Sequence, residues 1–321
     1  MVDLVGPVTM ISKSNRRFSD PLLFHDCLSM MHFCFKRFSG RLVKSHQRWL
    51  NFTVLLCLAA WKPAHLQADA NTGVGGPSQI SDAFTFVRVC YDSVGGYNEA
   101  WYQYEGRVWQ RWETDYPRAE KNLIFRLNEL TSMKIDPEPI VLRLTDDRLL
   151  DHPFIFMSDV GWQKLSKQER AGLERYLKRG GFLWVDDFWG KAEWDSFMQN
   201  IGTLRPNWKV RPIPPDHPIF SIVYPVKKCP QIPARIFYLQ TGMPWDPPFA
   251  HRSPTGGVAG VNQVRFMGLF DERDRLMAVA THNTDIADGW EREGESKEFF
   301  QRFSIQSYAI TINILVYALT H

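Results

Sequence analysis

Residues 165–187 combine a clearly marked helix with a strand that has no polar face, and this combination constrains the fold most strongly. Ser166 and Glu169 form a capping box, in which each side chain satisfies the other residue's backbone N–H group. Gly180 ends the helix, because glycine tolerates the left-handed conformation that follows a helix. The strand at 182–187, FLWVDD, is apolar on both faces until its two final carboxylates. Such a strand is typical of the centre of a parallel sheet that helices cover on both faces.

The same alternation of strand and helix extends from residue 83 to about residue 205. β-Branched and aromatic runs predict further strands, and apolar residues at helical spacing predict further helices. These strands lie at 84–92, 139–147 and 153–159, and these helices at 114–131 and 192–201. Alternating strands and helices form right-handed βαβ units, which place the strands in a parallel sheet. We therefore predict an α/β fold with a mostly parallel sheet and helices on both of its faces.

After residue 205, proline-rich loops separate shorter elements. Residues 234–242 and 261–271 resemble strands, and the second of these together with 276–285 predicts a hairpin that extends the fold. Apolar residues at helical spacing predict that 296–321 forms the closing helix. The aromatic and polar segment 97–113 has neither pattern, and we predict that it is a loop.

The first 70 residues form an N-terminal extension with the features of a secretory signal peptide. Basic residues precede the apolar run at 49–61, and Ala68-Asp69-Ala70 is a small-x-small cleavage pattern. The apolar run has 13 residues, whereas a helix that spans a bilayer needs roughly 20. We therefore predict a signal peptide near 31–70 and export to the periplasm or the extracellular space. The alternative is that residues 49–61 remain in the protein as a membrane anchor.

The remainder of the chain divides into a linker and one domain. Residues 71–82 are rich in glycine, serine and proline, as linkers are. We predict that residues 83–321 form a single α/β domain. The net charge is +5 over residues 1–70 and −2 over the rest, so the folded part lacks the basic balance of a nucleic-acid binder.

The five cysteines include no C-x-x-C pair, which argues against a structural zinc site. Cys90 and Cys229 are the cysteines beyond residue 70. In an exported protein they could form a disulfide, and the sequence leaves their pairing open.

Acidic residues stand where each predicted strand ends. They are Asp92, Asp146, Asp147, Asp159, Asp186, Asp187 and Asp285. Ligands of open α/β sheets bind beyond the carboxyl ends of the strands, so parallel strands would gather these carboxylates at one edge. Such an edge could hold Mg²⁺ or Ca²⁺, which prefer oxygen ligands, or could hydrogen-bond a polyol or sugar. We select Asp186 and Asp187 as candidate metal ligands, with Glu193 as a further member of the site.

A structural role is the alternative for each of these residues. Aspartate commonly caps the turn between strand and helix, where it accepts N–H bonds and interacts favourably with the helix dipole. One cap needs only one carboxylate, so the adjacent pair Asp186 and Asp187 leaves both interpretations open. Tryptophans near acidic residues could likewise stack on a sugar ring or cover an edge of the core. These tryptophans are Trp101, Trp109, Trp112, Trp189, Trp245 and Trp290.

Several motifs, taken in order, resemble the bacterial domain-of-unknown-function family DUF4159. They are Thr114–Glu120, LSKQERAGLERYLKRGGFLWVDDFWG at 165–190, Glu193-Trp194, His217–Phe220, Asn283–Asp285, Gly289–Glu291 and Asn313–Thr320. The resemblance covers residues 84–320. It implies export and a flavodoxin-like fold, similar to that of class I glutamine amidotransferases. It also implies that Asp115, His217, Asp285 and Glu291 are neighbours of the candidate carboxylates.

Glutamine amidotransferases place a nucleophilic cysteine on a sharp turn after a central strand. In this chain the corresponding turn, 186–190, reads DDFWG and carries no thiol. We therefore do not expect amidotransferase activity. The sequence contains no H-E-x-x-H and no G-x-S-x-G motif, so it does not support a metalloprotease or a serine hydrolase either.

These observations lead to three hypotheses. The first is an exported, non-catalytic module that binds a small molecule such as a carbohydrate-like or cell-envelope ligand, directly or through Mg²⁺ or Ca²⁺. The second is a hydrolase in which two carboxylates act as general acid and base or hold a metal that activates water. The third is a structural partner of an envelope protein complex, with segment 97–113 as its interface. We favour the first, which makes the protein a binding module rather than an enzyme.

Overall fold

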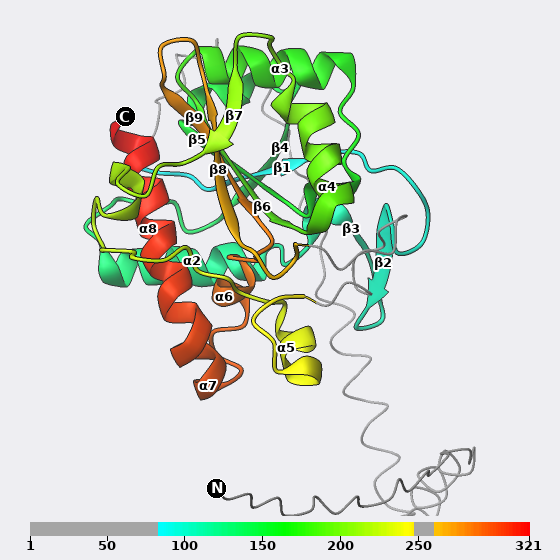
Figure 1. Cartoon of the computed structure of the whole chain (residues 1–321), viewed down its shortest axis with the longest axis vertical. Helices are drawn as coiled ribbons and strands as arrows, with labels where there is room; N and C mark the ends of the chain where they lie inside the picture. The colour runs from blue at the N-terminus through cyan, green and yellow to red at the C-terminus, as the bar shows by residue number, and fades with distance from the viewer. Residues whose placement is uncertain (1–82, 247–259) are drawn as a thin grey trace, which may run out of the picture. The chain divides into compact units, whose positions relative to one another are not determined.

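A seven-stranded sheet in the order β4-β1-β5-β6-β9-β8-β7 organises the described part of the chain (Figure 1). The computed structural model describes residues 83–246 and 260–321, all within the compact unit Gly76–His321. The predicted N-terminal extension 1–70 with its signal peptide, the alternative anchor 49–61 and the linker 71–82 lie outside the described residues. They stay predictions.

Five neighbouring strands of the sheet run parallel, and the last two run antiparallel to their neighbours. The strands are β1 (Val87–Cys90), β4 (Ile140–Arg143), β5 (Phe154–Ser158), β6 (Phe182–Phe188), β7 (Lys209–Pro212), β8 (Arg265–Phe270) and β9 (Leu276–His282). The central strand is β6, paired with β5 and β9 in parallel register. The predicted α/β fold, with its mostly parallel sheet and its late hairpin β8–β9, is confirmed.

Helices cover both faces of the sheet, as predicted. The α-helices are α2 (Arg118–Leu130), α3 (Lys167–Lys178), α4 (Gly190–Phe197), α5 (Arg235–Thr241), α6 (Asp288–Glu291), α7 (Lys297–Phe299) and α8 (Ile305–Thr320). Short 3₁₀ segments lie at Arg111–Glu113, Asp147–Asp151, Val160–Trp162 and Pro218–Phe220, and π segments at Met198–Gly202 and Phe300–Ser304.

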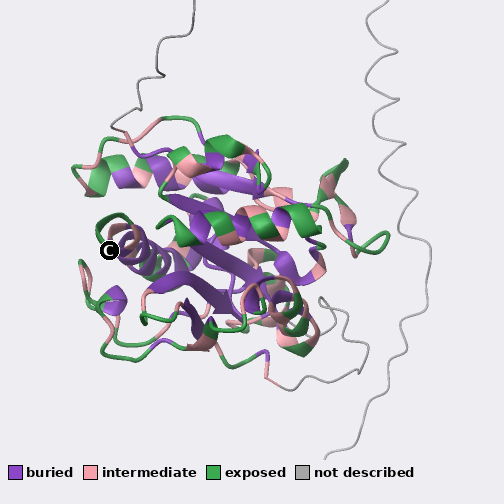
Figure 2. Ribbon diagram, turned by 90° about the horizontal axis from the view of Figure 1, so that it is seen from above, coloured by how far each residue is buried: buried purple, intermediate pink, exposed green. Residues whose placement is uncertain are grey.

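The side chains of β6 alternate between two separate cores, which explains why this strand is apolar on both faces. Trp184 packs in a core with Phe156 and with residues of α2, α6 and α8. Val185 faces the opposite core, which contains Met157 and residues of α3 and α4. The buried sheet lies between partly exposed helices in Figure 2. The predicted capping box of α3 is present, because Glu169 N–H donates to Ser166 Oγ at 3.2 Å and Ser166 N–H to Glu169 Oε2 at 2.9 Å.

Two predictions about secondary structure are wrong. Residues 234–242 are not a strand, because they contain helix α5, which ends at Gly242 in the left-handed conformation. Strand β8 pairs with β9 on one side and with β7 on the other. Residues 234–242 therefore cannot pair with β8 as an additional strand. The segment 97–113 is not a simple loop, because it contains the antiparallel hairpin β2 (Trp101–Tyr104) and β3 (Arg107–Gln110). Its turn residues Glu105 and Gly106 both have positive φ angles, as tight hairpin turns require.

The C-terminal helix is long and apolar enough to cross a membrane when length and composition alone are considered. It spans Lys297–Thr320, and its most apolar window has a mean hydropathy of 1.3. However, 61% of that window is buried inside the protein. Ile310, Ile314 and Leu315 belong to the core on one face of the sheet, so α8 acts as a core helix.

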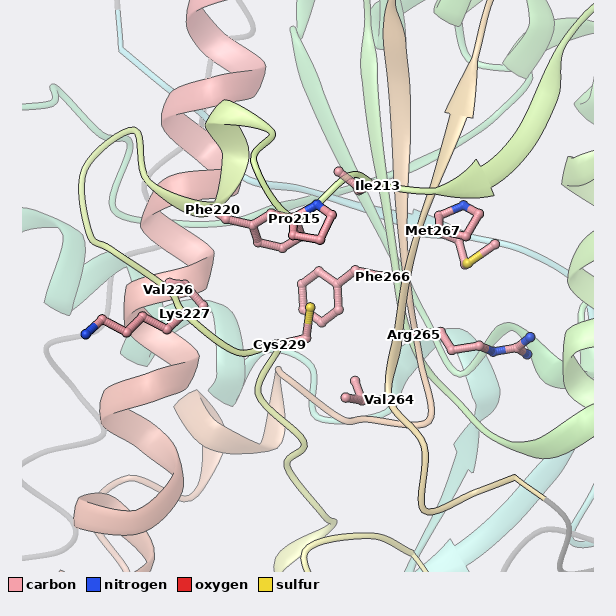
Figure 3. Close-up of a pocket in the computed structure, with 11 residues that line it drawn as sticks. Ile213, Pro215, Phe220, Val226, Lys227, Cys229, Val264, Arg265, Phe266 and Met267 are labelled. Atoms are coloured by element: carbon pink, nitrogen blue, oxygen red, sulfur yellow. The ribbon is translucent and has the colours of Figure 1, made fainter.

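A cavity of about 350 Å³ lies beside β8, between this strand and the proline-rich loops that precede α5 (Figure 3). Apolar side chains such as Phe220, Val226 and Phe266 line it, together with Cys229. None of the acidic residues selected from the sequence contributes to its lining.

Candidate functional site

The five parallel strands bring their carboxyl ends to one edge of the sheet, as predicted, but the acidic residues at this edge fall into two groups. Asp92, Asp146 and Asp147 face solvent. Asp92 pairs with Arg143 at 2.8 Å, Asp147 pairs with Arg175 at 2.6 Å, and Asp146 caps the short helix that follows it. These three residues have the structural role that capping and surface ion pairing predict.

The second group is buried and lies near the end of β6. It contains Asp159, Asp186, Asp187, Asp285, Asp288 and Glu291, with the half-buried Asp115 beside them. Carboxylates are rarely buried unless cations or hydrogen bonds compensate them. The contacts of each residue therefore decide whether it has a structural role or is available to a ligand.

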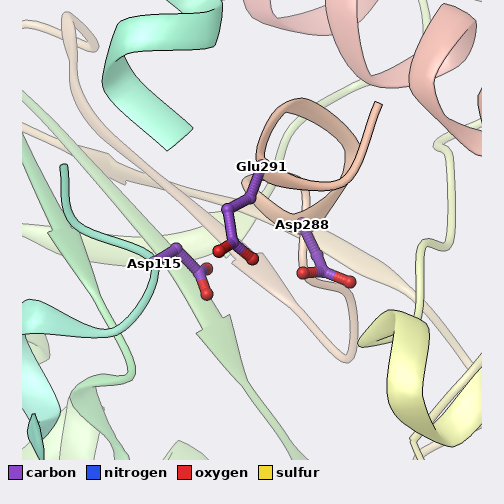
Figure 4. Close-up of side chains that lie close together, drawn as sticks. All are labelled: Asp115, Asp288 and Glu291. Carbon is purple, nitrogen blue, oxygen red and sulfur yellow. The ribbon is translucent and has the colours of Figure 1, made fainter. Parts of the chain in front are cut away.

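Asp115, Asp288 and Glu291 form the tightest group, which we call the acid triad. Each contributes an oxygen atom that lies within 4.8 Å of the others, and Figure 4 shows their carboxyl groups side by side. Asp115 comes from the segment before α2, whereas Asp288 and Glu291 are three residues apart on α6 and share one side of that helix. Asp115 has a φ of 66°, a conformation that aspartate tolerates better than most residues.

Cationic groups compensate the acid triad only in part. Arg292 contacts Glu291 and lies 3.5 Å from Asp288. The backbone N–H of Arg235 donates to Asp288 Oδ2. Asp115 Oδ2, in contrast, is buried and has no hydrogen-bond partner.

Burial raises the pKa of all three carboxyl groups, and the charges of other triad members raise it further for Asp115 and Glu291. Burial followed by the charge of Asp288 raises the pKa of Asp115 to about 7. The pKa of Asp288 rises to about 6, chiefly through burial. Burial and the charge of Asp115 raise the pKa of Glu291 to about 10. Near neutral pH the triad therefore holds protons unless a cation takes their place.

Asp186 and Asp187 are adjacent in sequence but have different roles. Asp186 is completely buried, accepts a hydrogen bond from Thr281 Oγ1, and accepts another from Ala287 N–H at 2.9 Å. It therefore fastens β6 to β9 and to the start of α6. Asp187 has a φ of 54° where the register of β6 shifts near its end, and it accepts a hydrogen bond from Trp189 Nε1 at 2.9 Å. Burial and the charges of Asp159 and Asp115 raise its pKa well above the usual value.

Asp285 interacts both with Asp187 and with members of the acid triad. Its Oδ1 accepts the backbone N–H of Asp288 at 2.8 Å, so it caps the short helix α6. Burial followed by the charges of Asp187 and Asp115 raises its pKa well above the usual value. The predicted residues Asp115, Asp187, Asp285 and Glu291 are thus electrostatic neighbours. Asp288 was not predicted, although the three-residue spacing of Asp285, Asp288 and Glu291 places them along one side of a helix.

A model of the family described as "Domain of unknown function (DUF4159)" matches residues 100–319. The chain belongs to this family. The match includes every member of the acid triad as well as Asp187 and Asp285. No curated protein matches the chain.

Glu193 of this DUF4159 domain lies in a different environment from the acid triad. Its Oε2 accepts the backbone N–H of Trp189 at 2.7 Å, which stabilises the turn between β6 and α4. Its side chain also fills the space that a Cβ atom at Gly161 would occupy. Asp159 pairs with Arg111 at 2.8 Å and accepts a hydrogen bond from Thr114 Oγ1. Both acids therefore have specific structural partners.

His217 does not neighbour the candidate carboxylates, and this prediction is wrong. Its Nδ1 accepts the backbone N–H of Ile219 at 3.2 Å, and its ring packs 5.1 Å from that of Tyr317. Tyr317 in turn contacts Phe182, the first residue of β6. His217 therefore lies toward the amino end of the sheet, because the loop after β7 leads away from the carboxyl edge.

Two of the candidate tryptophans belong to the core. Trp290 is fully buried and packs against Phe156 and Trp184, and Trp189 is 1% exposed. Neither offers a face to a sugar ring. Trp109 is half-buried, and the guanidinium of Arg107 lies 3.9 Å from the centre of its ring. The sequence could not distinguish these environments, because loop tryptophans of both kinds have similar neighbours in the chain.

The two described cysteines are free thiols, so they do not form a disulfide in the structure. Burial raises the pKa of Cys90, and raises that of Cys229 to about 11. Thiols of this kind are weak nucleophiles at neutral pH, since the thiolate is the reactive form. Asp187 takes the left-handed conformation near the end of the central strand, and residues 186–190 contain no thiol.

Proposed function

We propose that this domain is an exported binding module that holds a divalent cation at the acid triad and a hydroxyl-rich, carbohydrate-like or cell-envelope ligand beside it. The observation that carries the proposal is the acid triad itself, in which three carboxylate oxygens lie within 4.8 Å of one another. Mg²⁺ and Ca²⁺ prefer such oxygen ligands. A bound cation would remove the repulsion that keeps these groups protonated.

One unpartnered atom of the acid triad and one at the same edge of the sheet support the cation. Asp115 Oδ2 is buried without a hydrogen-bond partner, and so is the hydroxyl of Ser158 at the end of β5. Alternation along β5 puts Ser158 on the same face as Phe154 and Phe156, the face that α6 covers. Buried polar atoms normally have partners, so these two atoms are consistent with a ligand that completes the site.

Asp187 and Asp285 supply the remaining part of the proposed site. Both are coupled electrostatically to Asp115, and carboxyl oxygens accept hydrogen bonds from hydroxyl groups. Protein-bound Mg²⁺ and Ca²⁺ often keep water in part of their coordination shell, which ligand hydroxyls can replace. The raised pKa values of both described thiols argue against a reaction that uses a thiolate nucleophile.

Calorimetric titration of EDTA-treated protein with Ca²⁺ and with Mg²⁺ tests the cation site. We expect saturable binding of at least one cation, and a loss of more than about tenfold in affinity in Asp115→Asn and Glu291→Gln. Asp147→Asn is the matched control, because Asp147 is an exposed aspartate at the same edge. Equal affinity in all variants, or no binding to the wild type, would refute the cation site. A glycan panel with and without the cation then tests the ligand class, with Asp187→Asn as the variant.

A carboxylate-dependent hydrolase is the second candidate, and Asp187 is the observation that favours it. The residue stands in a left-handed conformation at the irregularity near the end of the central strand, and strained residues cluster at active sites. Its pKa is raised, so it could donate a proton to a leaving group while an ionised neighbour activates water. Hydrolysis of a glycan or ester panel that disappears in Asp187→Asn would favour this candidate over simple binding.

A third candidate function is that of a structural partner, with the hairpin β2–β3 as its interface with an envelope protein. Tyr97 before the hairpin is 52% exposed, and Val108 within it is 53% exposed. Replacement of both by serine, followed by cross-linking in envelope fractions, tests this role. A cross-linked partner that the double variant loses would support it, and an unchanged pattern would contradict it.

A further inference from the structure

Arg265 stands at the carboxyl edge of the sheet in a fixed orientation. It is the first residue of β8 and pairs in register with His282, whose other strand neighbour is Phe188 of β6. Its Nε and Nη2 atoms both reach His282 Nδ1, at 3.1 and 2.7 Å. Its guanidinium also lies over the ring of Trp194 in α4, 4.5 Å from the ring centre. A side chain held by two rings has lost most of its conformational freedom.

The histidine that holds Arg265 is a neutral acceptor. His282 Nε2 lies 2.8 Å from the carbonyl oxygen of Gly190, so Nε2 carries the proton and Nδ1 accepts from the guanidinium. Burial, followed by the charge of Arg265, lowers the pKa of His282 to about 3. The ring therefore orients the guanidinium without neutralising its charge.

Arg211 is also stacked on an aromatic ring, but it differs from Arg265 in having an acidic partner. The guanidinium of Arg211 also lies over an aromatic ring, 3.7 Å from the centre of Phe270, but it forms an ion pair with Asp274. Arg265 is exposed, and within residues 83–246 and 260–321 no acidic side chain pairs with it. Arg265 is one of the residues that line the cavity beside β8, and Figure 3 shows its guanidinium on the side away from Phe266 and Cys229.

We propose that Arg265 is an anion-binding subsite, which takes the carboxylate or phosphate group of a small-molecule ligand on the guanidinium edge that faces solvent. Guanidinium presents paired N–H donors that match either group. The neutral His282 and the ring of Trp194 fix this edge in advance, which lowers the entropic cost of binding. The subsite is independent of the proposed cation site, because none of the acid triad contacts it in the described structure.

Side-chain NMR of arginine in the whole protein tests the subsite with inorganic phosphate and with acetate as probes. Arg265→Lys identifies the Nε–Hε resonance of Arg265 by its disappearance. We expect a saturable shift of that resonance with at least one anion. The shift with phosphate alone indicates a phosphate ligand, and the shift with acetate alone indicates a carboxylate.

Affinity for the more effective anion is then followed through resonances of residues around Trp194. We expect Arg265→Met to weaken it at least about tenfold, as the loss of a charge-assisted hydrogen bond predicts, and Arg265→Lys to weaken it less. Arg211→Met, which removes an arginine stacked on an aromatic ring but paired with an acid, should leave it unchanged. The absence of a saturable shift with either anion, or equal weakening in Arg211→Met, would overturn the proposal.

Discussion

Two groups of buried ionisable side chains in this protein differ in whether their positive and negative charges match. One is the pair Arg88 and Glu120, and the other is the acid triad. Arg88 and Glu120 are both fully buried, and they form a hydrogen-bonded ion pair with an Nε–Oε1 distance of 2.7 Å. Arg88 also donates to the backbone carbonyls of Trp112 and Thr114. The acid triad, in contrast, gathers three carboxyl groups, and Arg292 contacts two of them, Asp288 and Glu291. A buried charge that has an oppositely charged partner can be accommodated within the fold. A buried group with more negative than positive charges must instead bind protons or an external cation.

The largest effect is expected when the balanced pair is broken. Arg88→Met leaves Glu120 buried without a cation, and we expect the free energy of unfolding to fall by about 3–5 kcal/mol. Urea denaturation measures the change. Arg175→Met, which removes an exposed partner of Asp147, is the control and should cost less than about 1 kcal/mol. Similar losses in the two variants would show that burial of the pair is not the cause.

The pH dependence of stability should separate the acid triad from the balanced pair. The folded-state pKa values of Asp115 and Asp288 are raised to about 7 and about 6, so between about pH 4 and pH 7 the folded protein binds more protons than the unfolded chain. In EDTA the free energy of unfolding should therefore fall as pH rises through this window, because each unit by which a folded-state pKa is raised corresponds to about 1.4 kcal/mol. Saturating Ca²⁺ or Mg²⁺ should reduce this fall. A stability that rises with pH in EDTA would contradict the assignment.

Replacing an acid of the triad by its neutral amide should raise the free energy of unfolding, whereas Arg88→Met should lower it. Asp115→Asn removes a charge that its neighbours repel, so at pH 8 in EDTA the free energy of unfolding should rise by about 1 kcal/mol. The same variant should lose the stabilisation that the cation gives to the wild type. Thermal unfolding with and without cation measures both changes. A destabilised Asp115→Asn protein in EDTA would mean that the triad is balanced by contacts within the fold.

The smallest effect is expected at the solvent-facing acids of the same edge. Asp147 is 84% exposed and pairs with Arg175, and exposed ion pairs contribute little to stability. Asp147→Asn should therefore leave both unfolding and cation affinity unchanged within error. A clear loss of cation affinity in this variant would enlarge the site beyond the acid triad.

Local signals in the sequence predicted the elements that local forces form. The capping box of Ser166 and Glu169 and the two-faced apolar strand β6 were both predicted where the structure has them. Helix α5 was mistaken for a strand, because its aromatic and aliphatic residues fit both structures and the availability of a sheet edge decides between them. The hairpin β2–β3 was missed because its polar and aromatic residues do not alternate clearly.

The candidate site was predicted less well than the fold. Asp115, Asp187, Asp285 and Glu291 do gather near the end of β6, but Asp186 and Glu193 are hydrogen-bonded into the structure, and His217 lies toward the other end of the sheet. Asp288 belongs to the acid triad, but the one local signal for it in the sequence is its three-residue spacing from Asp285 and Glu291. The Arg265–His282 contact joins residues that only the pairing of β8 with β9 brings together.

The sequence by itself determined the alternating strands and helices from β4 to α4 and the existence of a carboxyl edge with acidic residues, because propensity, capping and periodicity act over a few neighbouring residues. Tertiary structure alone decided which acids are buried together, which of them pair with an arginine, and which arginine has no acidic partner among the described residues. Burial and Coulomb interactions depend on distances between residues that are far apart in the chain, and those distances exist only after the sheet and its helices have packed.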